Sequence, residues 1–276
     1  MPELPEVETV KNGIAAFIGY AKIIKVKINN HKFRETIPEG IEAILEGATI
    51  IGYRRIGKYI IIELDNNQSV IWHLGMSGRI KTFKKLPDNI EKHDHIIIET
   101  EQGCLIYNDP RRFGLFTYAE TAHLDNVKCL SGMGIDPFDK KLDSEYPYTK
   151  LKHKKIPIKV ALLDQKIING IGNIYASEIL YASKITPLRS ADNISLDECR
   201  KIIKNTREVL QKAIDNGGST LRDYHKPDGS TGNFQNLHCV YDRTGQRCPD
   251  CNCGKGSITK IIQAGRSTFY CPFLQK

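Results

Sequence analysis

The chain has 276 residues, which is enough for two domains that each bury an apolar core without disulfides. Hydrophobic residues make up 40% and charged residues 26%, and no tract is repetitive or of low complexity, which excludes a disordered or fibrous protein. The net charge of +8 and the pI near 9.0 favour a polyanionic partner over a small neutral substrate.

No run of the sequence reaches the roughly 18 uncharged apolar residues that a membrane-spanning helix needs. The N-terminus also lacks the basic and apolar regions of a secretory signal peptide. We therefore expect a cytoplasmic protein with no membrane span.

The chain is expected to begin with a short helix, because Val7, Val10, Ile14 and Phe17 recur at helical spacing after Pro5. Short β-rich runs separated by turn formers follow, which predicts an antiparallel sandwich instead of alternating strand and helix units. The expected strands are 23–28, 49–56, 59–64, 69–74, 96–100, 104–107 and 115–118.

A segment rich in Gly, Pro and Asp predicts a linker at 132–148. Beyond it, a long helix is expected to open with a capping box of Ser195 and Glu198 and to end at Gly217-Gly218. Shorter helices are expected at 156–163 and 174–182, and a β-hairpin finger after Cys239. The expected domains are 1–131, 149–237 and 238–276.

The N-terminus carries the first candidate for chemistry. A Met-Pro start normally loses its methionine, which leaves Pro2 with a free secondary amine that can form an iminium with a sugar carbon. An α-amino group titrates near pH 7.7–8.0, so a useful fraction is nucleophilic at neutral pH. From the dipeptide alone, however, the better interpretation is that Pro2 and Glu3 simply start a helix.

The longer run PELPEVETV changes that interpretation, because it resembles the N-terminus of formamidopyrimidine-DNA glycosylases, bacterial enzymes that remove 8-oxoguanine and ring-opened purines. The similarity continues through the whole chain. It implies that Pro2 is a Schiff-base nucleophile, that Glu3 donates a proton, and that Lys58 is a second catalytic donor used in β-elimination. By its local pattern alone, Lys58 is a solvated lysine in a hairpin turn.

Two further motifs, HLGMSG and DPRRFG, match a triad that fills the gap left by an extruded nucleotide in this family. The matching residues are Met76, Arg111 and Phe113. Taken singly, such a Met and such a Phe usually pack in a core. Two adjacent arginines beside an aromatic residue are costly to bury and suit a phosphate groove.

The resemblance also assigns contacts with the DNA backbone to His93, Arg112, Lys155 and Asn173. Lys155 lies in a run with five lysines, for which a solvated face is the plainer interpretation, although phosphate partners explain such density better. Asn173 follows two glycines at the start of an expected helix, where backbone amides bind phosphate well.

Two features near the C-terminus complete the expected site. The resemblance implies that Arg266 in AGRSTF grips DNA and takes part in δ-elimination. The segment GGSTLRDYHKPDGSTG at 217–232 is expected to be a mobile loop over the damaged base.

The family's finger holds one structural zinc ion with two Cys-x-x-Cys pairs. Here Cys248 and Cys251 form the first pair, but Leu274 replaces the second cysteine of the pair that begins at Cys271, and leucine cannot bind metal. Zinc held by three thiolates and a metal-free hairpin therefore stay open as alternatives. Other candidates for the fourth ligand are water, Cys253, Cys239 and His238.

The expected fold is α+β: an antiparallel β-sandwich flanked by helices, a helix-two-turns-helix domain and a zinc-finger-like hairpin. The resemblance implies a monomeric glycosylase and AP lyase of base excision repair that binds double-stranded DNA in a basic cleft between its domains, removes oxidised purines and cuts by β,δ-elimination. One alternative is the sister branch that acts on oxidised pyrimidines, whose PEGPE-type start differs from PELPE. Another is a catalytically silent DNA-binding protein.

Overall fold

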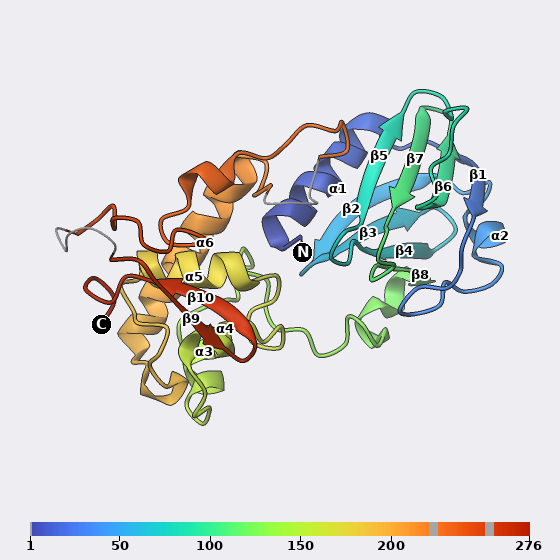
Figure 1. Ribbon diagram of the computed structural model, residues 1–276. Coiled ribbons are helices and arrows are strands. Elements are labelled where there is room, and N and C mark those ends of the chain that lie inside the picture. Colours follow the sequence, from blue (N-terminus) through green and yellow to red (C-terminus); the bar gives the residue numbers. More distant parts are fainter. Residues whose placement is uncertain (1, 221–225, 252–256) are drawn as a thin grey trace. The chain divides into compact units, whose positions relative to one another are not determined.

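The structure is a computed structural model that describes residues 2–220, 226–251 and 257–276 (Figure 1). It contains two compact units: unit 1 comprises residues 1–131 and 216–235, and unit 2 comprises 132–215 and 236–276. The expected linker therefore lies within unit 2, and the segment after the long helix returns to unit 1.

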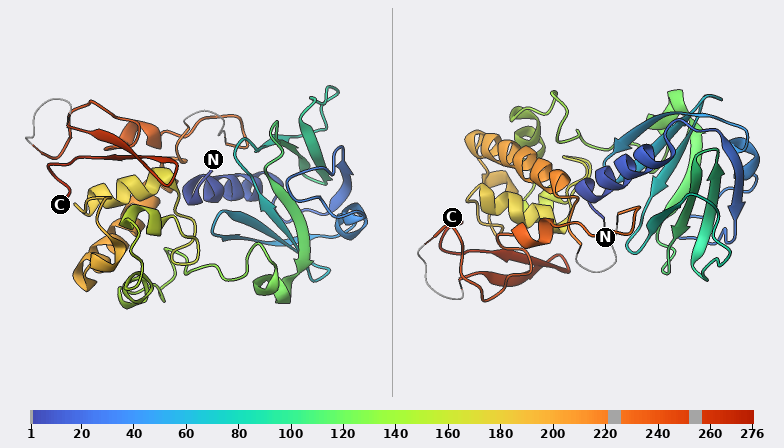
Figure 2. Two further views of the ribbon diagram at one scale, coloured as in Figure 1. Left: turned by 60° about the horizontal axis from the view of Figure 1, so that its bottom comes forward. Right: turned by 90° about the horizontal axis from the view of Figure 1, so that it is seen from above.

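Unit 1 is an antiparallel β-sandwich, as the sequence predicts. Its two four-stranded sheets, which are labelled in Figure 1 and seen from two other sides in Figure 2, have the orders β1-β6-β7-β5 and β2-β3-β4-β8. The strands are β1 Ile23–Ile28, β2 Ile50–Ile56, β3 Tyr59–Leu64, β4 Gln68–His73, β5 Arg79–Phe83, β6 Asp94–Thr100, β7 Gly103–Asn108 and β8 Leu115–Glu120. Only β5 falls outside the expected strands.

The core of unit 1 is formed by the inner faces of both sheets. The ring of Trp72 lies 5.3 Å from that of Tyr107 and 4.9 Å from that of Phe116, so β4 contacts β7 of the opposite sheet as well as its neighbour β8. Helix α1, Leu4–Ile18, buries its apolar face in the same core. The unit also contains α2, Ile41–Leu45, and the 3-10 helix η1, Thr121–Asn126.

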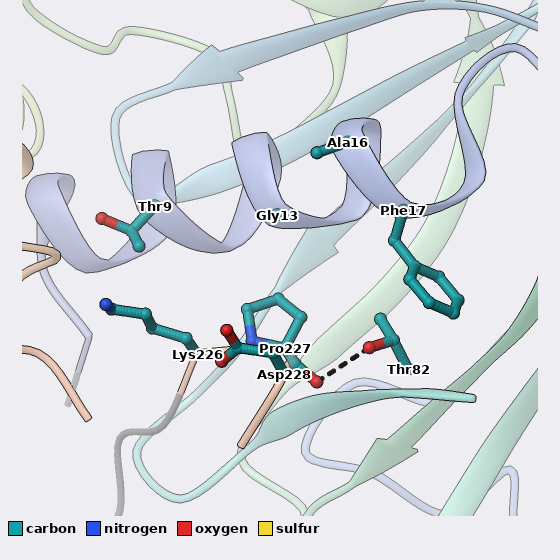
Figure 3. A pocket seen from close by; sticks show the side chains of 8 residues that line it. All are labelled: Thr9, Gly13, Ala16, Phe17, Thr82, Lys226, Pro227 and Asp228. Carbon is teal, nitrogen blue, oxygen red and sulfur yellow. Dashed lines mark hydrogen bonds between the residues drawn. The ribbon is translucent and has the colours of Figure 1, made fainter. Parts of the chain in front are cut away.

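Residues 226–228 pack beside α1 (Figure 3). The carbonyl oxygen of Pro227 accepts hydrogen bonds from the backbone N–H and the hydroxyl of Thr82, at 3.2 and 3.0 Å. Gly13 allows this approach, because a Cβ there would lie 2.9 Å from the ring of Pro227. A pocket of about 320 Å³ remains between these segments. Residues 221–225 of the expected mobile loop lie outside the described residues.

Unit 2 is helical and ends in the expected hairpin. Its helices are α3 Glu145–Leu151, α4 Ile158–Leu162, α5 Asn173–Ala182 and α6 Leu196–Asp215, with 3-10 helices at Ala191–Asn193 (η2) and Phe234–Leu237 (η3, which begins in unit 1). The predicted capping box of α6 is confirmed, since Ser195 and Glu198 exchange backbone-to-side-chain hydrogen bonds of 3.0 and 3.2 Å. Strands β9, Thr259–Gln263, and β10, Arg266–Tyr270, pair antiparallel.

The fold is therefore α+β, with antiparallel sheets, a helical region and a C-terminal hairpin. In the described parts of the chain, none of the helices combines the length and the apolar character that crossing a bilayer would require.

Candidate functional site

The predicted nucleophile lies at the very start of unit 1. Pro2 and Glu3 are both buried and directly precede α1, where Glu3 is the N-cap residue. The carboxylate of Glu6, also buried, accepts the backbone N–H of Glu3 at 2.8 Å through Oε2. Because this bond satisfies a donor at the helix start, the backbone beside Pro2 is held in one place.

Lys58 lies in the tight turn between β2 and β3, where Gly57 adopts a positive φ of 58°. Arg55 donates from Nη1 to the carbonyl oxygen of Gly57 at 3.1 Å, and from Nε to the carboxylate of Glu8 at 2.9 Å. Since Glu8 belongs to α1, these bonds tie the turn to the N-terminal helix. Lys58 is only 7% exposed, so it is not the solvated turn lysine of the plainer interpretation.

His73, the last residue of β4, lies beside this turn, because it pairs with Tyr59 at the start of β3. Its ring lies 4.8 Å from the ring of Tyr59. Burial, together with the positive charges of Lys58 and Arg34, lowers the pKa of His73 to about 4. The imidazole is therefore neutral at pH 7, and its Nδ1 accepts the N–H of Gly75 at 3.0 Å. This bond fixes the start of the loop after β4.

Two loops of unit 1 carry the triad that the sequence assigns to intercalation. We call them the tip loops: residues 74–78, after β4, and residues 109–114, after β7. Met76 is 38% exposed and Phe113 is 43% exposed, so neither side chain is packed in the core as the plainer interpretation expects. The guanidinium of Arg111 lies 4.7 Å from the centre of the Phe113 ring, a cation–π contact. The tip loops thus present apolar and cationic groups at the surface.

The other predicted DNA contacts of unit 1 are Arg112, which lies within the second tip loop, and His93, which is hydrogen-bonded to that loop. Arg112 is exposed and has a positive φ of 54°, and its carbonyl oxygen accepts the N–H of Arg34 at 3.0 Å. His93 directly precedes β6, and its carbonyl oxygen accepts the N–H of Asp109 at 3.0 Å. The rings of His93 and His95 lie 6.1 Å apart. Both predicted contacts are therefore fixed through their backbones.

In unit 2, the structure places Asn173 at the first residue of α5. Its Nδ2 donates to the carbonyl oxygen of Ser267 in β10 at 2.9 Å. Its Oδ1 accepts a hydrogen bond from Nζ of Lys159, a fully buried lysine of α4. The Asn173 side chain therefore joins the neighbouring helices α4 and α5 to β10, whose Ser267 lies 94 positions further along the chain.

Arg266 is the exposed first residue of β10 and is adjacent to the strand residue that Asn173 contacts. Lys155 is exposed between α3 and α4, whereas the lysine of that run which reaches Asn173 is Lys159. The hydroxyl of Tyr241 lies 3.5 Å from the Asn173 amide nitrogen. The structure thus links Asn173 to the hairpin that carries Arg266.

Three buried charged residues that hold these groups were not expected from the sequence: Glu6, Asp109 and Lys159. Each lies in a sequence motif that also contains a predicted site residue. One available signal was the position of Lys159 between Ile158 and Val160, which is unusual for a solvated lysine.

The hairpin brings together Cys248, Cys251 and Cys271, whose sulfur atoms all lie within 4.8 Å of one another. The sulfur atoms of Cys251 and Cys271 are 3.6 Å apart, close to the spacing of about 3.8 Å that two thiolates have on one tetrahedral zinc ion. These three residues therefore fit a metal ion.

The fourth position of this cluster is apolar. Leu274 packs against the buried residues that surround the cysteines. Among the described residues, the cluster includes neither His238 nor Cys239, and Cys253 lies outside the described residues. The described part of the chain thus supplies three sulfur ligands.

Comparison with known proteins agrees with this arrangement. The family model described as "Formamidopyrimidine-DNA glycosylase N-terminal domain" matches residues 1–116, and the one described as "Formamidopyrimidine-DNA glycosylase H2TH domain" matches residues 133–225. A formamidopyrimidine-DNA glycosylase of Dinoroseobacter shibae is 40% identical, and one of Zymomonas mobilis is 42% identical, each over the full length of both chains. The chain belongs to the formamidopyrimidine-DNA glycosylase family. The resemblance predicted from the sequence is thereby confirmed.

Solved structures of formamidopyrimidine-DNA glycosylases show the same fold. A MutM structure in complex with DNA containing carbocyclic 8-oxo-G superposes with a TM-score of 0.89 at 36% identity, covering all of both chains. The Lactococcus lactis enzyme, in complex with DNA containing an abasic site, superposes with a TM-score of 0.90 at 35% identity, covering 99% of each chain. As a member of the formamidopyrimidine-DNA glycosylase family, the chain is a DNA-repair glycosylase.

Proposed function

We propose that this protein is a bifunctional glycosylase and AP lyase that removes oxidised purines from double-stranded DNA. The observation that carries the proposal is the buried Pro2-Glu3 start of α1, in a chain that is 40% identical over its full length to a formamidopyrimidine-DNA glycosylase. The MutM relative was solved with DNA containing 8-oxo-G, and a Lactococcus lactis relative with DNA containing Fapy-dG. Both lesions are oxidised purines.

The proposed chemistry begins with the removal of Met1, which frees the secondary amine of Pro2. The amine attacks C1′ of the damaged nucleotide, the bond from C1′ to the base breaks, and the base leaves with a proton, for which Glu3 is the proposed donor. The resulting aminal opens when the bond from C1′ to O4′ breaks and O4′ takes up the proton that the Pro2 nitrogen loses, which leaves an iminium that acidifies the C2′ proton. Loss of that proton expels the 3′ phosphate, and a second elimination expels the 5′ phosphate.

Lys58 and Arg266 have distinct proposed roles in these eliminations. Lys58 is buried in a turn tied to α1, which suits a proton-transfer group held at a fixed place in unit 1. Arg266 is exposed at the start of β10, where its guanidinium can bind a phosphate group during δ-elimination.

The proposed DNA contacts fall into two kinds. Met76, Arg111 and Phe113 would enter the base stack, because they are exposed together on the tip loops. The proposed backbone contacts are His93, Arg112, Lys155 and Asn173. Because such contacts release counterions, binding should weaken with salt at a log-log slope of about −0.9 per neutralised phosphate. We propose that the protein acts as a monomer in the cytoplasm.

We also propose one structural Zn²⁺ held by Cys248, Cys251 and Cys271, with a fourth ligand that is water or Cys253. When bound, the ion would cross-link the two ends of the hairpin segment and so support the position of Arg266. It would have no part in base removal, since Pro2 and Glu3 belong to unit 1.

Borohydride trapping tests the proposal. The protein is incubated with a duplex that contains 8-oxoguanine opposite cytosine, and the reduced adduct is digested and mapped by mass spectrometry. We expect a covalent adduct that maps to Pro2 of a chain that lacks Met1. A fully active protein that keeps Met1 would overturn the mechanism, and preference for a duplex with an oxidised thymine would favour the pyrimidine branch.

A further inference from the structure

Asp109, the first residue of the second tip loop, is 0% exposed and joins the two tip loops through its carboxylate. Its Oδ1 accepts the hydroxyl of Ser77, in the first tip loop, at 2.7 Å, and the N–H of Arg111 at 3.3 Å. Its Oδ2 accepts the N–H of Gly114 at 2.9 Å. One side chain therefore bonds the loop that carries Met76 to the loop that carries the rest of the triad.

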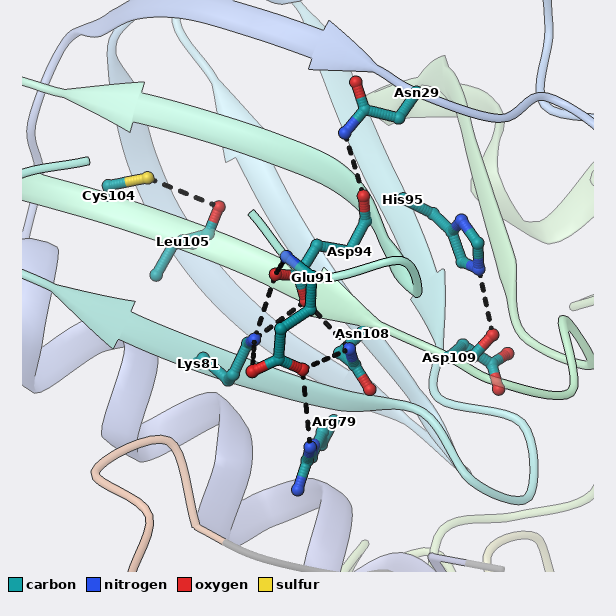
Figure 4. A network of polar contacts seen from close by, with 10 residues as sticks. All are labelled: Asn29, Arg79, Lys81, Glu91, Asp94, His95, Cys104, Leu105, Asn108 and Asp109. Atoms are coloured by element: carbon teal, nitrogen blue, oxygen red, sulfur yellow. Dashed lines mark hydrogen bonds and ion pairs between the residues drawn. The ribbon is translucent and has the colours of Figure 1, made fainter. Parts of the chain in front are cut away.

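The backbone of Asp109 joins a third segment to the same centre. Its N–H donates to the carbonyl oxygen of His93 at 3.0 Å, and its carbonyl oxygen lies 3.1 Å from Nε2 of His95 (Figure 4). The same carbonyl oxygen accepts the N–H of Arg112 at 3.2 Å. Asp109 thus holds the segment that carries His93 to the second tip loop, which also contains Arg112.

The two tip loops also pack closely against each other at Gly75. A Cβ on Gly75 would lie 2.6 Å from the carbonyl carbon of Phe113 and 2.5 Å from the backbone nitrogen of Gly114. The hydroxyl of Tyr107 donates to the carbonyl oxygen of Leu74 at 3.0 Å and also lies 3.3 Å from Oδ2 of Asp109. A buried carboxylate with several donors forms strong, directional bonds, which makes the joined loops rigid.

We propose that Asp109 is a positioning residue that sets the triad on the tip loops for entry into the DNA duplex. The inference rests on the proposed function. Asp109 has no access to DNA and acts through Ser77, Arg111 and Gly114, so its effect is confined to the step in which the triad replaces the extruded nucleotide. Preorganised loops lose less entropy in that step than mobile ones.

Two variants weaken the hydrogen bonds between the Asp109 carboxylate and the tip loops to different degrees. Asp109→Asn keeps the size of the side chain but replaces one acceptor oxygen with an NH₂ group. That group cannot accept a hydrogen bond from the backbone N–H of Arg111 or of Gly114, whichever it faces. Ser77→Ala removes only the link to the first tip loop and leaves Asp109 bonded to its own loop. The matched control is Ser69→Ala, because Ser69 is a buried serine at the other end of β4 whose hydroxyl bonds Thr121 at 2.8 Å.

Two assays separate loop positioning from chemistry. The first compares single-turnover excision from an 8-oxoguanine duplex with borohydride trapping on single-stranded DNA that holds one aldehydic abasic site, where there is no base pair to open. The second measures the fluorescence of 2-aminopurine placed beside the lesion at saturating protein, which reports unstacking without any covalent step. Thermal unfolding of each variant confirms that it is folded.

We expect Asp109→Asn to lower the duplex rate about tenfold or more, and Ser77→Ala about fivefold, while trapping on the single strand changes by less than about twofold. The 2-aminopurine signal should fall in the same order, and Ser69→Ala should match the unmodified protein in all three measurements. Equal losses on both DNA substrates, or an unchanged duplex rate and 2-aminopurine signal in Ser77→Ala, would overturn the inference. If the unmodified protein formed no adduct at all, the proposed function would be wrong. The 2-aminopurine assay would still test the inference about the tip loops, because it needs no covalent step.

Discussion

The carboxylate of Glu6 accepts the backbone N–H of Ser219 at 2.7 Å, across 213 positions of sequence. The other oxygen of the same carboxylate accepts the N–H of Glu3. Glu6 therefore connects the segment that carries the proposed nucleophile to the segment that follows α6. Gly218 makes room for this contact, because a Cβ there would lie 2.8 Å from Oε1 of Glu6.

Replacing Glu6 should weaken both connections. In Glu6→Gln an NH₂ group faces the N–H of either Glu3 or Ser219, so we expect the free energy of unfolding to fall by about 1–3 kcal/mol. Excision of 8-oxoguanine should fall as well. The control is Glu46→Gln, an exposed carboxylate that accepts the N–H of Val26 at 2.9 Å, where we expect a change within about 0.5 kcal/mol. Urea titration gives both values, and similar losses in the two variants would contradict the argument.

The ion pair between Arg55 and Glu8 should matter for strand cleavage. Arg55→Met removes the bonds that tie the Lys58 turn to α1, and we expect a loss of about 1–2 kcal/mol in stability. Cleavage of the DNA strand should slow more than release of the base, because Lys58 is proposed to act in the elimination. Gel assays with and without alkali separate the two steps.

The neighbouring residue provides the control for that variant. Arg54 pairs with Glu63 at 2.6 Å but is 49% exposed, and exposed ion pairs contribute only about 0–1 kcal/mol. Arg54→Met should therefore leave both steps nearly unchanged. If Arg55→Met slowed base release and strand cleavage to the same extent, the proposed role of the turn would be wrong.

The strands of unit 1 could be predicted because their apolar residues follow a clear pattern between turn formers. β5 lacks that pattern: of its five residues only Ile80 is buried, and the strand is held mainly by pairing with β7. Helix α3 was missed for a related reason, since it contains Pro147 and lies in a segment whose composition predicts a linker. Proline fits the first turn of a helix, and tertiary contacts of Leu151 then stabilise the rest.

The residues proposed to act on DNA could be named from motifs, but the residues that hold them could not. Asp109 stands inside DPRRFG and Glu6 inside PELPEVETV, yet nothing in either motif shows that the carboxylate is buried. Burial of a charge depends on donors supplied by distant segments, such as Ser77 for Asp109 and Ser219 for Glu6. Sequence spacing gives no signal of such long-range bonds.

The half-buried His73 should make the protein sensitive to acid. Its pKa is about 4 in the folded protein against 6.5 for an ordinary histidine. As the pH falls below 6.5, the unfolded chain takes up the proton first, so stability is lost between pH 6.5 and pH 4. We expect the unmodified protein to lose about 1–2 kcal/mol more than His73→Asn between pH 7.5 and pH 5.

Urea titration at both pH values measures that difference. His123→Asn is the control, because the His123 side chain is 64% exposed and should contribute little. The same acid loss in the unmodified protein and in His73→Asn would show that His73 is protonated more easily than its burial implies.

A fourth thiolate at position 274 should strengthen metal binding by the hairpin. Leu274→Cys completes the second Cys-x-x-Cys pair next to three sulfur atoms that already lie within 4.8 Å of one another, so reduced protein should retain about one zinc ion per chain against a chelator that strips the unmodified protein. Leu274→Ser is the control, since it loses the same apolar contacts and gains no thiolate. We expect tighter DNA binding by Leu274→Cys and an unchanged rate of base release, because Pro2 and Glu3 lie in unit 1. Metal content and DNA affinity equal to those of the unmodified protein would show that the finger does not need the missing ligand.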